Sequence, residues 1–160
     1  MPEVASSPVH SSVVVDAPID RAFTVFTDGI ASWWPPDHHI IEGELASMEF
    51  EPWVGGSIVD RGVDGSECRW ARVLAYEPPD RVVFSWDLNL QWTVETDHRR
   101  TSEVEVRFTP DGSGRTRVDL EHREIHRHGD GWEEMHSAVG SPDGWVVGLE
   151  RFASRLASDA

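Results

Sequence analysis

The chain has 160 residues, a formal net charge of −15 and 39% hydrophobic residues, with eight tryptophans among them. The length suits one domain with one substantial core, and the apolar content is typical of a globular protein rather than a disordered one. All 14 basic residues are arginine, and the acidic surface repels phosphate groups, so we expect neither a nucleic acid nor a membrane as partner.

The N-terminal part predicts one strand and two helices. Residues 1–8 are small and polar and predict a disordered N-terminus, and residues 9–158 predict a single domain. Apolar residues at helical spacing predict a helix over the stretch "DAPIDRAFTVFTDG", which the Asp28-Gly29 pair ends. The flanking elements that we expect are a strand carrying Val13 and Val15 and a short helix over residues 30–34.

A series of strands follows, separated by turn residues. The strand signals are "ASMEFEPW", "SIVDRG", "ECRWARVLAYE", "RVVFSW", "SEVEVRFT" and "RTRVDLEH". Alternate apolar residues continue from Val82 to Val94, which places Ser85 and Asp87 toward solvent. The pattern leaves open whether residues 86–101 form one long strand or include a loop.

The C-terminal part returns to helical spacing. An apolar stripe predicts a long helix over residues 142–156, with Ser141 as its N-cap. Trp132 and Val139 indicate a shorter helix just before it. The order of elements is therefore strand, helix pair, antiparallel strands and long helix, which predicts an α+β fold with a curved sheet around the last helix.

This order, together with several stretches of sequence, resembles the START-like or SRPBCC superfamily. More narrowly, the chain resembles the family named after the activator of the heat-shock protein 90 ATPase. The stretches that carry the resemblance are "VVVDAPIDRAFTVFTDGIASWW", "FEPWVGGSIVDRGVDG", "RVLAYEPPDRVVFSW", "SEVEVRFTPDGSGRTRVDLEH" and "GWVVGLERFASRL". The resemblance implies the helix-grip fold, also found in birch-pollen-allergen-like proteins, and a cavity between sheet and C-terminal helix.

The resemblance leaves three functions open. The first is binding of a small hydrophobic or aromatic ligand in the cavity, with no assigned reaction. The second is a co-chaperone-like protein that binds heat-shock protein 90 and stimulates its ATPase. The third is an enzyme of the polyketide cyclase or aromatase kind, in which shaping a reactive chain supplies much of the catalysis. We expect a monomer or a homodimer. The sequence assigns no catalytic residue, and it leaves open whether the protein is an enzyme.

Aromatic residues and one histidine are the candidates for the cavity. His122 shares the parity of Val118 and Leu120, so it points inward with them if they face the core. An inward histidine either contacts a ligand or is satisfied by a neighbouring polar group. The candidate ligand-binding residues are Trp34, Trp70, Phe84, Trp86, Trp92, His122, Trp145 and Leu149.

No motif indicates a metal or cofactor. The spacing of His122, His126 and His128 lacks a preset backbone for metal binding, and the stretch "DHH" at residues 37–39 is expected to be a loop. Cys68 is the only cysteine, which excludes an intramolecular disulfide and favours a reducing, cytoplasmic location.

Overall fold

The computed structural model describes residues 7–35 and 43–158. The strands are β1 (Val9–Val15), β2 (Leu45–Phe50), β3 (Ser57–Gly62), β4 (Glu67–Glu77), β5 (Arg81–Trp86), β6 (Ser102–Pro110) and β7 (Thr116–Arg123). The α-helices are α1 (Ile19–Thr27), α2 (Trp132–Gly140) and α3 (Val147–Ser158). Residues 37–39 lie outside the described residues, so the loop expected there is not tested.

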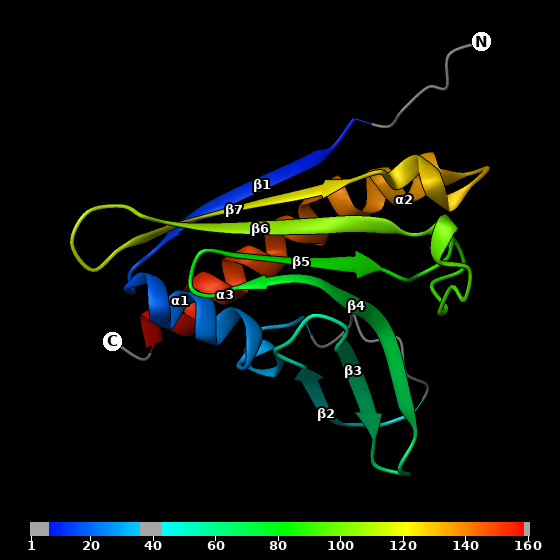
Figure 1. The fold of residues 1–160 in the computed structure, drawn as a ribbon, viewed down its shortest axis with the longest axis horizontal. Coiled ribbons are helices and arrows are strands. Elements are labelled where there is room, and N and C mark those ends of the chain that lie inside the picture. Colours follow the sequence, from blue (N-terminus) through cyan, green and yellow to red (C-terminus); the bar gives the residue numbers. More distant parts are fainter. Residues whose placement is uncertain (1–6, 36–42, 159–160) are drawn as a thin grey trace.

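The strands form one antiparallel sheet in the order β1-β7-β6-β5-β4-β3-β2 (Figure 1). β4 is the longest strand, and its pairing with β5 shifts register between Val73 and Ala75. Such irregularities bend a strand, and Figure 1 shows β4 curving away from the flatter half of the sheet. The predicted α+β class and the curved antiparallel sheet are confirmed.

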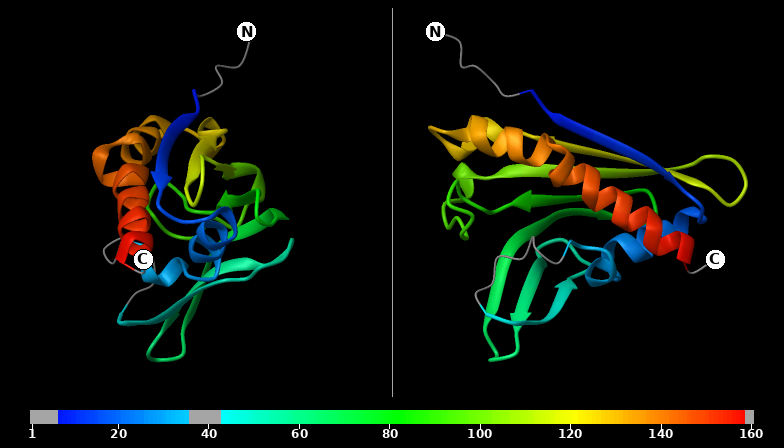
Figure 2. Two further views of the ribbon diagram at one scale, coloured as in Figure 1. Left: turned by 90° about the vertical axis from the view of Figure 1, so that its left-hand side faces the viewer. Right: turned by 180° about the vertical axis from the view of Figure 1, so that it is seen from behind.

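Helix α3 lies across one face of the sheet (Figure 2). Its apolar side packs against the first helix, where the Phe26 and Phe152 ring centroids are 5.3 Å apart. Trp33 follows α1 and lies 5.4 Å from the ring of Phe152. The Trp33 indole N–H also donates to the carbonyl oxygen of Val25 at 3.1 Å, which holds the chain after α1 against the core.

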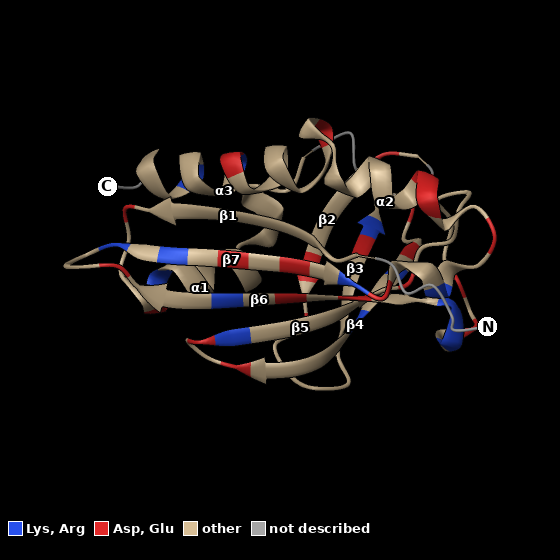
Figure 3. Ribbon diagram, turned by 90° about the horizontal axis from the view of Figure 1, so that it is seen from above, with Lys and Arg blue, Asp and Glu red and all other residues tan. Residues whose placement is uncertain are grey.

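The opposite face of the sheet carries alternating charges across β5, β6 and β7 (Figure 3). Glu105 lies at the centre of this group and is hydrogen-bonded to Arg81 and, at 2.6 Å, to Arg123. Arg107 is 2.9 Å from the same carboxylate. Neighbouring strands therefore pair opposite charges on the outer face, while their alternate residues fill the core.

The predicted continuous last helix is wrong. Helix α3 begins at Val147, and the preceding turn contains a non-helical residue, Gly144, with φ −91° and ψ −127°. A β-carbon at Gly144 would lie 2.3 Å from the carbonyl oxygen of Val139, so only glycine fits where α2 and the turn meet. Ser141 occupies the N-cap position before Pro142, as predicted, but its side chain makes no capping hydrogen bond, because its hydroxyl donates to the carbonyl of Ala138 at 2.8 Å.

The apolar alternation after β5 does not continue as a strand. β5 ends at Trp86, and a loop follows in which only Leu88 and Val94 form an isolated bridge. Ser85 and Asp87 are buried, contrary to the sequence prediction. The reason is Arg72 of β4, whose backbone N–H donates to Ser85 Oγ at 2.8 Å and whose guanidinium donates to the Asp87 carboxylate at 2.9 and 3.0 Å.

Candidate functional site

A cavity of about 350 Å³ lies where the sheet, the α2–α3 turn and the residues after α1 meet. This volume is at the lower end of the range for small-molecule sites, about 300–1,000 Å³. The lining residues are Trp34, Pro35, Trp70, Trp86, Leu88, Trp92, Ala138, Val139, Ser141, Asp143, Gly144, Trp145 and Gly148. Most of them are apolar, so the cavity favours an apolar ligand held by few polar contacts.

Four of the tryptophans that line this cavity form a closed group of ring contacts. Trp34, Trp70, Trp86 and Trp145, here called the tryptophan quartet, contact one another in that order and back to Trp34, with ring centroids 5.3–5.9 Å apart. They come from four separate places in the fold: the segment after α1, β4, β5 and the turn before α3. All four are buried, and their polarisable faces and edges suit contact with a flat aromatic molecule.

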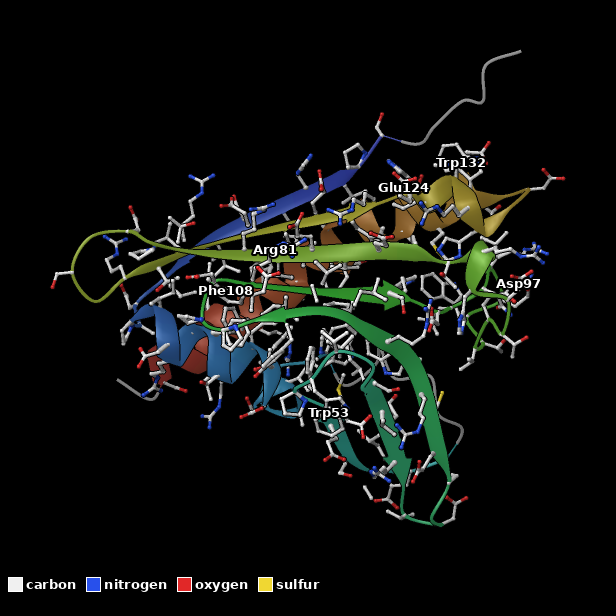
Figure 4. The ribbon with its side chains drawn as sticks, in the orientation of Figure 1. Trp53, Arg81, Asp97, Phe108, Glu124 and Trp132 are labelled. Atoms are coloured by element: carbon white, nitrogen blue, oxygen red, sulfur yellow. The ribbon has the colours of Figure 1, made fainter. Side chains whose placement is uncertain are left out.

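The rim of the cavity is formed by the loop after β5 and by the α2–α3 turn. Asp97 of this loop and Trp132 of α2 lie at the same end of the sheet (Figure 4). Trp92 is 41% exposed and has φ 61°, an unusual value for a bulky residue. Asn89 holds this conformation, since its side chain accepts from the N–H groups of Gln91 and Thr93 at 2.9 and 3.1 Å.

A buried chain of hydrogen bonds lies behind the quartet. The Trp145 indole N–H donates to His122 Nδ1 at 3.1 Å. His122 Nε2 is 2.7 Å from Ser102 Oγ, and Ser102 Oγ is also 2.7 Å from His128 Nε2. Ser102, His122 and His128 are all buried, so three polar side chains sit in an otherwise apolar region.

Both histidines of this series of hydrogen bonds, His122 and His128, are neutral at physiological pH. The pKa of His122 is lowered from 6.5 to about 3. Burial is the main cause, and the nearby His128 and His136 add to the shift. Burial likewise lowers the pKa of His128 to about 4, although Glu95 and Asp87 oppose the shift. These rings therefore act as neutral hydrogen-bond groups rather than as cations.

The structure brings five of the eight sequence candidates together. The tryptophan quartet and Trp92 line the cavity. Phe84, His122 and Leu149 are buried, but they are not among the residues that line it. His122 lies behind Trp86 and Trp145, with ring centroids 5.2 and 6.1 Å away. The inward direction predicted for His122 is therefore correct, and its contact with a ligand stays a prediction.

Ser102 was not among the sequence candidates, and His128 was considered there only as a possible metal ligand. Ser102 shares the parity of Val104 and Val106 in β6, so the same alternation that placed His122 also marks this serine as inward. His128 lies in a short 3₁₀ turn after β7, where neither helical nor strand spacing indicates a direction. Within residues 7–35 and 43–158, no three His, Cys, Asp or Glu side chains are placed to hold a metal ion.

The curved antiparallel sheet, the C-terminal helix and the cavity define a helix-grip protein of the SRPBCC superfamily. The family described as "Activator of Hsp90 ATPase homolog 1-like protein" matches residues 16–157, and the chain belongs to this family. A search of curated proteins gave no match. Among the described residues, no helix is long and apolar enough to cross a membrane.

Solved structures of several proteins are similar over almost the whole chain. An anthrahydroquino-gamma-pyrone synthase, Txn09, solved in complex with SUM, is 43% identical, with a TM-score of 0.66 over 97% of this chain and 99% of that one. The self-sacrificing resistance protein CalC from Micromonospora echinospora is 25% identical, with a TM-score of 0.70 over 96% of each chain. Protein MLL2253 from Mesorhizobium loti is 18% identical, with a TM-score of 0.68 over 96% of this chain and 99% of that one, and shares the fold. Fold, cavity and relatives together support a ligand-binding protein of this superfamily.

Proposed function

We propose that this protein binds a planar polycyclic aromatic molecule in the cavity and closes an oxygen-containing ring on it. The observation that carries the proposal is the tryptophan quartet, which lines the cavity with aromatic rings from four parts of the fold. The name of the 43% identical synthase supports a γ-pyrone as the ring formed. The third function left open by the sequence, a polyketide cyclase-like enzyme, is thus the one that we favour.

The chemistry that we propose is a cyclodehydration. A hydroxyl group on the aromatic nucleus adds through its oxygen to a carbonyl carbon of a neighbouring diketone side chain, and the adduct then loses water. The cavity walls supply the main effect by holding the side chain folded against the nucleus, since correct positioning replaces a costly loss of conformational freedom.

Asp143 is the proposed proton acceptor. Among the described residues that line the cavity, it is the only one with an ionisable side chain. It lies in the α2–α3 turn at the exposed rim, where it can take the hydroxyl proton as the oxygen adds and return a proton to the departing water. Positioned acid–base groups of this kind contribute typically about 10²–10⁴-fold to a rate.

The test uses binding and turnover separately. Isothermal titration with 1,8-dihydroxyanthraquinone is expected to show one equivalent bound with micromolar affinity. An anthrahydroquinone carrying a 1,3-diketone side chain next to a hydroxyl is expected to lose one water, followed by mass spectrometry. Asp143→Asn should slow this step about 10²-fold or more and leave binding unchanged. Absence of binding by wild-type protein would refute the proposal, and binding without turnover would leave a ligand-binding protein only.

Trp92→Ala is expected to weaken binding of the same anthraquinone about 2- to 10-fold, which is the usual value of one aromatic contact. Stability should change by less than about 0.5 kcal/mol, because the ring is 41% exposed. Trp53→Ala is the matched control, since Trp53 is 53% exposed and is not a lining residue. The control is expected to change neither quantity, and an unchanged affinity in Trp92→Ala would remove Trp92 from the site.

The co-chaperone function is the second candidate, and the family description supports it. It predicts that the purified protein binds heat-shock protein 90 and raises its ATPase rate. A coupled ATPase assay with and without this protein decides the question. An unchanged rate at saturating protein would eliminate this candidate without affecting the proposed binding of an aromatic ligand.

A further inference from the structure

We infer that His122 is a positioning residue: together with Ser102 and His128 it fixes the indole ring of Trp145 and thereby sets which flat ligands the cavity accepts. The inference rests on the proposed function, because it concerns the wall of the same cavity. It differs from a ligand-contact role, since His122 is separated from the cavity by Trp86 and Trp145. His122 therefore acts on a ligand only through these rings.

Trp145 lies in the turn between α2 and α3, outside both α-helices. It follows the non-helical residue Gly144 and precedes α3, which begins at Val147. Its ring is nevertheless buried and contacts Trp34 and Trp86 at 5.9 and 5.4 Å. The hydrogen bond from the indole N–H to His122 Nδ1 ties this ring to β7.

The directions of the first two hydrogen bonds in this series follow from the indole group. An indole N–H only donates, so His122 Nδ1 must accept and carries no proton. The neutral ring then carries its proton on Nε2 and donates it to Ser102 Oγ. The Ser102 hydroxyl keeps its own proton, for which His128 Nε2 is the acceptor 2.7 Å away. Each group has one role, and a change at any link disturbs the acceptor that Trp145 needs.

Stability alone does not account for these polar groups. Replacing both partners of a buried hydrogen bond by apolar groups of the same shape is often neutral or stabilising, whereas leaving one partner unpaired is costly. A buried hydrogen-bond network instead favours one arrangement of the side chains around it. Here the side chains around it are two walls of the cavity, because His122 packs against Trp86 as well as binding Trp145.

The experiment is a double-mutant cycle between Ser102 and Trp145. Ser102→Ala breaks the chain two links from the ligand, and Trp145→Phe removes the indole donor but keeps a ring. Affinity for 1,8-dihydroxyanthraquinone is measured by titration calorimetry in all four proteins. Ser102→Ala is expected to weaken binding roughly 3- to 10-fold when Trp145 is present and less than 2-fold in the Trp145→Phe protein, which corresponds to one lost hydrogen bond. Ser102→Thr keeps the hydroxyl and is expected to restore binding.

A second measurement needs no ligand. The indole N–H resonance of Trp145, assigned by its loss in Trp145→Phe, is expected to shift in Ser102→Ala and to return in Ser102→Thr. Equal losses of affinity in both backgrounds, or an indole resonance that does not move, would overturn the inference. Failure of the wild-type protein to bind the probe would overturn the proposed function instead, and the indole resonance would then decide alone whether Ser102 fixes the ring.

Discussion

Trp34→Ala is expected to lower the free energy of unfolding by about 3–5 kcal/mol, the usual cost of truncating a large buried aromatic side chain. Trp34 is 7% exposed and contacts the rings of Trp33, Trp70 and Trp145. The truncation removes these contacts at the place where the segment after α1 meets β4 and the α2–α3 turn. Urea denaturation followed by far-ultraviolet circular dichroism measures the change.

Trp53→Ala provides the control for Trp34→Ala. Trp53 lies in the turn between β2 and β3 (Figure 4), and its ring is mostly in solvent, so its removal should cost less than about 0.5 kcal/mol. Wild-type stability in Trp34→Ala would show that this ring only lines the cavity. A large loss in both variants would show that the comparison reports tryptophan content rather than burial.

Acidification is expected to destabilise the protein strongly, beginning near pH 6.5. The folded state keeps His122 and His128 neutral down to pKa values of about 3 and about 4, whereas the unfolded chain takes up protons near the ordinary value of 6.5. The unfolded state therefore binds more protons, and stability is lost as the pH falls. One pKa unit corresponds to about 1.4 kcal/mol, so His122 alone accounts for about 5 kcal/mol by pH 3.

The two histidines dominate the slope of the free energy of unfolding against pH between about pH 6 and 5, above the range in which carboxyl groups with lowered pKa values, such as Glu105, contribute strongly. In this range each histidine contributes up to about 1.4 kcal/mol per pH unit. His128→Gln is expected to reduce the slope by one proton, measured by urea denaturation at fixed ionic strength. Trp53→Ala removes no titrating group and should keep the wild-type slope. A wild-type slope in His128→Gln would mean that His128 takes up its proton in the folded state.

Much of the fold could be predicted from the sequence, because strand and helix periodicity reflect which side chains face the core. The alternation in β7 correctly placed His122 inward, and the tryptophans assigned to a cavity do line one. The resemblance to the SRPBCC superfamily supplied what periodicity does not, namely how the sheet and the last helix are arranged. The family match over residues 16–157 confirms that assignment.

The incorrect predictions concern residues whose burial or backbone conformation depends on a contact with a distant part of the chain. Asp87 has the solvent-facing parity, but Arg72 on the neighbouring strand pairs with it and buries it. The break at Gly144 depends on the carbonyl of Val139, a contact between two helices that helical spacing does not reveal. The buried chain joins Ser102 and His128 across 26 positions, and no local signal links them.

The lining of the cavity combines buried residues, among them the tryptophan quartet, with an exposed rim that includes Ala138 and Asp143. Substitutions at exposed positions usually change stability by less than about 0.5 kcal/mol, so the rim can accept new side chains while the quartet preserves the fold. Related genes can therefore diverge in ligand choice through successive rim mutations, each of which leaves a folded protein for selection to act on.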